Sequence, residues 1–149
     1  MPRLSCWFVK AALLHLAVGV LLGGLILSAK GLPTIFGWAW LLLPTHIQLL
    51  VGGWLIQLAL GVAYWILPRL TGAGERGRPR WAWLSFGALN AGVLGAALAL
   101  PLWSLYRTPW LGGTLALAAL LQVVALGAFI WHAWPRLQPI PQPVPAQRA

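Results

Sequence analysis

Acidic residues are almost missing from this sequence, which has one Asp or Glu against ten Lys and Arg in 149 residues. Charged residues make up only 7% of the chain and hydrophobic residues 60%, and the mean hydropathy is +0.83. This composition lies far from that of soluble domains and indicates an integral membrane protein. Because no acid lies in a long apolar run, the usual groups of a proton relay or a carboxylate-bridged metal centre are missing.

Cysteine is nearly absent as well. Cys6 is the single cysteine, so an internal disulfide and a cysteine-based metal cluster are both excluded. The sequence also lacks an HExxH motif, a glycine-rich phosphate loop, a CxxCH site for covalent haem and a Ser, His and Asp constellation. The candidate chemistry therefore reduces to three histidines, His15, His46 and His132.

The basic residues lie in short segments between apolar runs rather than on one soluble face. This distribution is typical of charges that set membrane topology, and it argues against a nucleic-acid partner. The segment from 69 to 80 carries four arginines and three glycines, and the positive-inside rule places it in the cytoplasm. We expect a prokaryotic-type inner (cytoplasmic) membrane. The first apolar run is too long for a typical signal peptide.

Four apolar runs are long enough, at ~1.5 Å per residue, to cross ~30 Å of hydrocarbon. We therefore predict an all-α four-transmembrane-helix bundle with both termini cytoplasmic. One membrane domain would cover 1–137, and 138–149 would be a Pro-rich cytoplasmic tail. Residues 31–43 are predicted to form a short helix or hairpin at the surface, and Pro44 to open the second span. The predicted spans are about 7–29, 44–67, 81–102 and 111–134.

Small and polar side chains share one face of the second run. On a helix the positions of His46, Leu50 or Gly53, Gln57, Gly61 and Tyr64 recur at steps of three or four residues. Polar groups turned towards lipid are costly, so this face should point into protein or at a cofactor.

His15 precedes a GxxxG seam, Gly19 and Gly23, in the first run. We expect His15 to be hydrogen-bonded inside the bundle, with a cofactor ligand as the alternative. His132, flanked by Trp131 and Trp134, is expected to hydrogen-bond at the interface.

The three histidines lie at different predicted depths. His46 is near the outer surface, His15 ~12 Å from the inner one, and His132 close to the inner interface. A bis-histidine haem needs two imidazoles at similar depth, which no pair within the chain provides. His46 would therefore need a second ligand from a symmetry mate or partner, or would bind five-coordinate haem.

Two segments carry a resemblance to a known family. THIQLLVGGWLIQLALGVAYWILPRLTG resembles the second transmembrane helix of the catalytic subunit of the haem-copper oxidase and nitric oxide reductase superfamily, and FVKAALLHLAVGVLLGGLIL is similar to its first helix. The similarity covers about the first half of the chain. It implies that His46 corresponds to the low-spin haem ligand. The superfamily's catalytic metal site takes further histidines from later helices, so no reductase activity of the chain alone is implied.

The resemblance leads to the hypothesis of a membrane b-type haem-binding protein that transfers electrons in a respiratory-chain assembly. Its cofactor-binding residues would be His46, which ligates the iron, with Gly53, Gln57 and His15. Gly52 and Gly53 would admit the macrocycle close to the backbone. Because one chain offers one well-placed outer histidine, we predict a homo-oligomer, most simply a dimer, with the second run near its axis.

The alternative hypothesis is a cofactor-free accessory or assembly subunit of a larger membrane enzyme. Gly19, Gly23, Gly53 and Gly61 would then be contact positions for the partner. A small transporter or channel is least favoured, since the spanning runs lack charge.

Overall fold

The computed structural model describes residues 1–69 and 78–137, and its long elements there are all helices. The four helical segments long and apolar enough to cross a membrane confirm the predicted four-span all-α bundle. The predicted tail, 138–149, and most of the arginine-rich loop lie outside the described residues. The spans, numbered first to fourth, are Arg3–Gly31, Pro33–Ile66, Pro79–Tyr106 and Pro109–Arg136.

Prolines mark where several helices begin. Helix α5 (Pro79–Tyr106) and helix α6 (Pro109–Ala133) both have proline in the first turn, where the missing N–H has no helical acceptor and the fixed φ suits a helix. Helix α1 (Arg3–Gly31) ends two residues before another proline, Pro33. A short 3-10 turn, η3 (Trp134–Arg136), closes the fourth span.

The second span changes helix type along its length. Helical turns are present within the stretch 31–43 that was predicted to be a short helix or hairpin, but they continue directly into the second span, which begins at Pro33 rather than at the predicted Pro44. Pro44 lies in the first turn of the α-helical segment that follows them. A π-helical segment follows that segment directly, which the sequence pattern did not predict. In chain order the segments are α2 (Pro33–Phe36), the 3-10 segment η1 (Gly37–Leu42), α3 (Leu43–Gln48), the π-helix η2 (Leu49–Ile56) and α4 (Gln57–Ile66).

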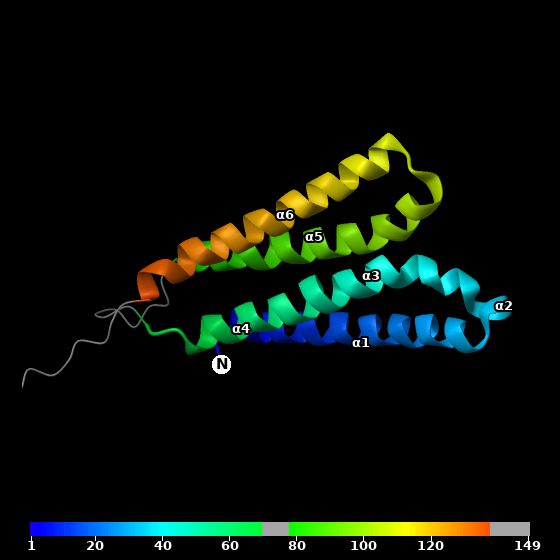
Figure 1. The fold of residues 1–149 in the computed structure, drawn as a ribbon. Helices are drawn as coiled ribbons and strands as arrows, with labels where there is room; N and C mark the ends of the chain where they lie inside the picture. Colours follow the sequence, from blue (N-terminus) through cyan, green and yellow to red (C-terminus); the bar gives the residue numbers. More distant parts are fainter. Residues whose placement is uncertain (70–77, 138–149) are drawn as a thin grey trace, which may run out of the picture.

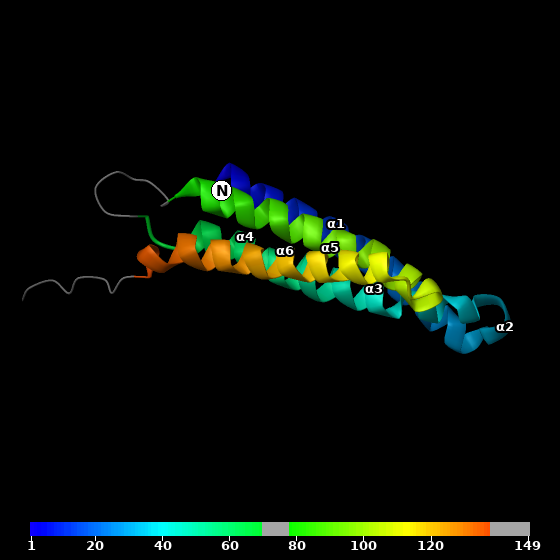
Figure 2. The same ribbon diagram turned by 90° about the horizontal axis from the view of Figure 1, so that it is seen from above.

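The bundle consists of two helical hairpins. The first span packs against the second, and α5 packs against α6. Helix α5 also lies along α3 and η2, so it joins the two hairpins (Figures 1 and 2). The described chain begins and ends at the same end of the bundle (Figure 1), as an even number of spans requires.

Small residues allow α5 and α6 to approach closely. The buried positions of α5 are mostly Ala, Gly and Ser, and α6 presents Ala118, Ala125 and Ala128. In lipid, where helix association relies on packing, such small side chains bring two backbones into contact. Large aliphatic side chains such as Leu14, Leu98 and Val123 are instead exposed on the outer surface, where lipid tails would cover them.

A proline inside α5 is compensated by a neighbouring hydroxyl. Pro101 has no N–H, so the carbonyl of Ala97, four residues earlier, loses its helical donor. Thr45 of the second span donates to this carbonyl over 2.9 Å. This is the way transmembrane helices accommodate proline, with a neighbouring helix satisfying the freed group. The same bond fixes the depth of the second span against α5.

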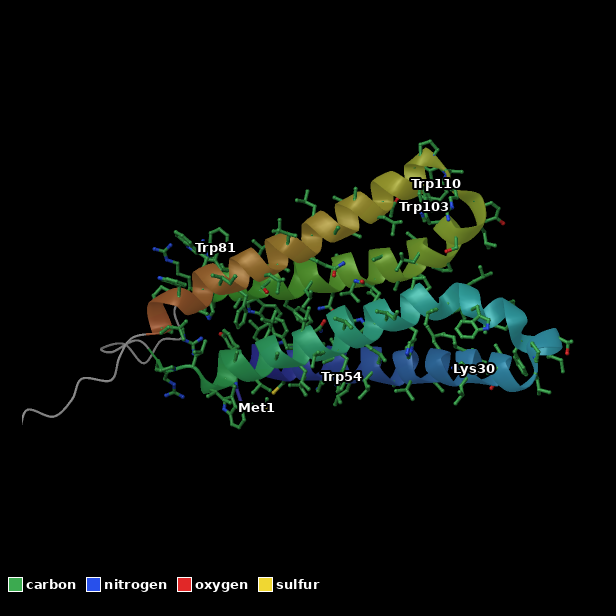
Figure 3. All side chains as sticks on the ribbon, viewed as in Figure 1. Met1, Lys30, Trp54, Trp81, Trp103 and Trp110 are labelled. Atoms are coloured by element: carbon green, nitrogen blue, oxygen red, sulfur yellow. The ribbon has the colours of Figure 1, made fainter. Side chains whose placement is uncertain are left out.

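Exposed tryptophans gather near both ends of the spans. Trp81 lies at the same end as Met1, whereas Trp103 and Trp110 lie at the opposite end and Trp54 lies between (Figure 3). These positions agree with two aromatic belts, since tryptophan favours the headgroup level of a bilayer. The exposed tryptophans are Trp7, Trp65, Trp81, Trp83, Trp131 and Trp134 towards the end with Met1, and Trp38, Trp40 and Trp110 towards the other.

Candidate functional site

Two histidines bind carbonyls across the contact between the first and second spans. Nδ1 of His15 donates to the carbonyl oxygen of Gly53 over 3.0 Å, and Nδ1 of His46 donates to that of Gly19 over 2.7 Å. Because a carbonyl can only accept, Nδ1 carries the proton in each ring. In the neutral form Nε2 then holds a lone pair. The expectation that His15 is hydrogen-bonded inside the bundle is confirmed.

Glycines provide the space that the two imidazoles occupy. A Cβ atom added at Gly53 would lie 2.7 Å from Cγ of His15, and one added at Gly23 would lie 2.7 Å from Cε1 of His46. Both distances are shorter than real contacts allow, so each ring packs directly on backbone. Gly53 was expected to admit a macrocycle; in the structure it admits the imidazole of His15.

The other expected contact glycines are also covered by side chains of the same chain. A Cβ atom added at Gly19 would meet Leu50 at 2.7 Å, and one added at Gly61 would meet Phe8 at 2.6 Å. The four glycines assigned to a partner under the accessory hypothesis therefore pack the first two spans against each other. The pattern identified a seam correctly but did not reveal which helix fills it.

The π-helix η2 lies between His46 and Gln57. Its hydrogen bonds run from residue i to i+5, and it contains both Gly52 and Gly53. The carbonyl that accepts from His15 is part of this segment. Since π-helical turns occur frequently at functional sites, the combination makes this stretch the centre of the candidate site.

Gln57 is fully buried and binds a side chain of α5 rather than open space. Its Nε2 donates to Oδ1 of Asn90 over 3.2 Å, and Nδ2 of Asn90 donates to the carbonyl of Phe86 over 2.8 Å. Oε1 of Gln57 has no partner within the described residues. This residue was expected to contact a cofactor, and the structure places it between the two hairpins.

A second amide pair, which the sequence reasoning missed, links the second span to α6. Nε2 of Gln48 donates to Oε1 of Gln122 over 3.0 Å. A Cβ atom added at Gly52 would lie 3.4 Å from Oε1 of Gln122, and one added at Gly92 would lie 2.8 Å from its Cγ. The two glycines thus leave room for Gln122. Glutamines in apolar runs were the available signal, because such groups seek partners in a membrane.

His132 belongs to a separate cluster at the end of the fourth span. Its Nδ1 donates to the carbonyl of Arg78 over 3.0 Å, and Arg136 donates to its Nε2 over 3.1 Å. The ring also stacks on Tyr64 with centroids 5.2 Å apart. The expected hydrogen bonding of His132 is confirmed, and its place at the membrane interface stays a prediction.

Arg136 is buried and fastens the end of the second span. It donates to the carbonyls of Tyr64, Leu67 and Pro68 over 3.3, 2.6 and 2.9 Å. These carbonyls lie at the C-terminal end of α4, where helical donors run out and a cation is favourable. The sequence placed this arginine only as the end of an apolar run.

His15 and His46 are at different heights on their shared seam. His15 packs opposite Gly53, which follows His46 by seven residues, and His46 packs opposite Gly19 and Gly23, which follow His15 by four and eight residues. The two rings are thus separated by between one and two helical turns. They cannot face each other across one iron, and among the described residues no group of three or more His, Cys, Asp or Glu side chains could hold a metal ion.

These residues therefore fit a haem only in part, because they supply one candidate axial ligand but leave no space for the macrocycle at Gly52 and Gly53. His46 has the features of an axial ligand, because a bond from Nδ1 to a carbonyl orients the ring and leaves Nε2 for the metal. His46 is half-buried, and its ring packs against the first span at Gly23. Gly52 and Gly53 offer no cradle, since Val93, Gln48, Gln122 and His15 already cover them.

The chain matches no family model, no curated protein and no solved structure.

Proposed function

We propose that this protein is a membrane subunit that binds b-type haem through Nε2 of His46 and serves electron transfer within a homo-oligomer or a larger respiratory assembly. The observation that supports this most is the 2.7 Å bond from Nδ1 of His46 to the carbonyl of Gly19. Such a bond selects the tautomer whose Nε2 lone pair faces away from the acceptor, and it is common behind metal-bound histidines.

The second axial ligand would come from outside the chain. His15 is one to two turns away along the seam, and His132 lies in the cluster with Arg136. A two-fold axis normal to the membrane would bring the His46 rings of two copies to the same depth automatically. In this arrangement the bound haem supplies the redox chemistry, while the chain orients the ligand and keeps it in an apolar environment.

An absorbance spectrum of the purified protein tests this proposal directly. We expect reducible Soret and α bands that disappear in His46→Gln and persist in His132→Gln. His132 is far from His46, because it belongs to the fourth span and stacks on Tyr64 at the other end of the second span. Haem content by pyridine haemochrome assay, combined with the mass in detergent, should give one haem per two chains. A colourless preparation from haem-replete cells would exclude haem binding, and one haem per monomer would exclude the symmetric pair.

A matched glycine pair tests whether the seam positions the ligand. Gly23→Ala would push a methyl group to 2.7 Å from Cε1 of His46, whereas Gly24→Ala meets nothing within 4 Å. We expect the first variant to lose or shift the Soret band and the second to keep it. If both variants keep an unchanged spectrum, the ring of His46 is not the group that sets the haem environment.

A cofactor-free accessory subunit is the second candidate function, and one observation favours it. Every glycine of the two seams is filled by side chains of the same chain, so His15 and His46 already have complete structural roles as carbonyl donors. Glutamine at position 46 can still donate to the Gly19 carbonyl but cannot ligate haem iron as imidazole does. A colourless protein whose His46→Gln variant keeps its melting temperature would support this candidate.

A further inference from the structure

Exposed cations are concentrated at one end of the bundle. Arg3 and Lys10 on α1, Arg69 after α4, and Arg78 and Arg80 at the start of α5 are all exposed. Met1 and Trp81 mark this end in Figure 3. The opposite end, where Lys30 lies, carries only one other exposed cation among the described residues, Arg107.

Acidic side chains of the chain itself cannot neutralise this charge. The whole sequence has one acid, Glu75, and it lies outside the described residues. Even if that carboxylate paired with one of the five exposed cations, four would still need a counter-charge from elsewhere. Like charges held on neighbouring helix ends repel each other, so binding of anions at this end is favourable.

Two of these cations, Arg3 and Lys10, lie on the same exposed face of α1. Arg3, Trp7 and Lys10 follow one another at steps of four and three residues, so they form one stripe on α1. The ammonium of Lys10 lies 5.9 Å from the ring centroid of Trp7, within reach of a cation–π contact.

Arg80 on α5 lies at the height of Arg3. The rings of Phe8 and Phe86 are in contact, with centroids 5.1 Å apart, which aligns the two helices. Arg3 is five residues before Phe8, and Arg80 is six residues before Phe86. Since both helices run in the same direction, the two arginines differ in height by about 1.5 Å, the rise of one residue.

We propose that the cations at this end, Arg3 and Lys10 on α1 and Arg80 on α5, bind the headgroups of anionic phospholipids. The exposed tryptophans at this end place the cations at the headgroup level, where phosphodiester groups lie. Basic side chains at that level attract anionic lipids. A zwitterionic lipid brings its own ammonium, which the clustered cations repel. The acyl chains would lie on the exposed aliphatic side chains of α1, such as Leu14. This site is independent of the haem proposal.

Native mass spectrometry of the full chain in a neutral detergent tests the site, with dioleoyl phosphatidylglycerol and dioleoyl phosphatidylcholine as probes. We expect phosphatidylglycerol to bind more tightly. The triple variant Arg3→Gln, Lys10→Gln and Arg80→Gln should weaken its binding roughly 100-fold, at about fivefold per cation removed. The double variant Lys30→Gln and Arg107→Gln, at the other end, should bind like the unmodified chain.

Two control experiments separate the role of charge from other causes of lost binding. A variant with Arg3→Lys and Arg80→Lys retains the charge and should retain binding, which separates loss of charge from loss of fold. Inorganic phosphate at the lipid concentration should not compete, because it cannot contact the apolar surface. Equal affinity for the two lipids, unchanged binding by the triple variant, or full competition by free phosphate would each overturn the proposal.

Discussion

Polar side chains inside this bundle bind mainly to backbone carbonyls. His15, His46, Thr45, His132 and Arg136 all donate to carbonyls of another segment. The composition explains this, because spans without carboxylates offer few other acceptors, and each carbonyl has a second lone pair. The helices are therefore paired by hydrogen bonds of defined direction without any buried ion pair between the spans that the structure describes.

Gly92 should tolerate no side chain. A Cβ atom there would lie 2.7 Å from the carbonyl oxygen of Ala118, a backbone atom that cannot move without separating α5 from α6. We expect Gly92→Ala to destabilise the protein by about 1–3 kcal/mol, as overpacking does in well-packed cores. The control is Gly95→Ala on the same helix, whose Cβ would make an ordinary 3.6 Å contact. Thermal unfolding in detergent measures both, and equal melting temperatures would contradict the expectation.

Replacing Arg107 by glycine should stabilise the folded protein. Arg107 adopts a left-handed conformation, with φ of 45°, at the C-terminal end of α5, and it is exposed. Glycine enters this region without the steric penalty of a Cβ atom. Arg107→Gly should therefore raise the stability by roughly 0.5–1 kcal/mol, visible as a higher melting temperature. Arg107→Ala, which keeps the Cβ atom, is the matched control and should show no such gain.

At the scale of elements, the second span is the least regular helix and makes the most varied contacts. It passes from a short α-helical turn through 3-10, α and π geometry back to α, and it hydrogen-bonds the first, third and fourth spans. Changes of helix type alter which residues share a face, since the number of residues per turn changes. Leu49, Gly52, Gly53 and Gln57 are thereby all buried.

Thr45 and Pro101 should show energetic coupling. Thr45→Val removes the donor to the Ala97 carbonyl, which Pro101 has already deprived of its helical partner. We expect a cost of about 1 kcal/mol, near the upper part of the range for hydrogen bonds between membrane helices. In a Pro101→Ala background, residue 101 can donate to that carbonyl again, so the cost of Thr45→Val should be smaller. A double-mutant cycle on the free energies of unfolding measures this coupling, and additive effects of the two substitutions would contradict it.

For the whole molecule, the two hairpins are joined by few but specific contacts. Phe8 meets Phe86, Thr45 binds Ala97, and the amide pairs connect the second span to α5 and α6. The end of the fourth span returns to the end of α4 through Arg136. Because the number of spans is even, the beginning and the end of the described chain lie at one end of the bundle (Figure 1).

Both ends of the chain should therefore report the same side of the membrane. The exposed cations lie at that end, so the positive-inside rule predicts the cytoplasm for both. Fluorescent-protein fusions at either terminus should be bright, and alkaline phosphatase fusions inactive. A fusion within the connection near Arg107 should behave oppositely. Opposite signals from the two termini would contradict the even number of spans.

The sequence by itself determined the fold class and the number of spans. Hydropathy is a property of each local segment, and four apolar runs without acids can be stable only as helices in lipid. The hydrogen bonding of His15 and of His132 also followed from local chemistry. These features depend on residue type and depth, which a linear pattern records.

Only the tertiary structure decided which partner each polar group has. Gly53 accepts from His15, Gln57 binds Asn90, and Gln48 finds Gln122 across 74 positions of sequence. Each pairing depends on the relative depth and rotation of two helices and on the π-helical segment that shifts the register of the second span. Helix periodicity places residues on a face of their own helix, but it carries no information about the helix opposite.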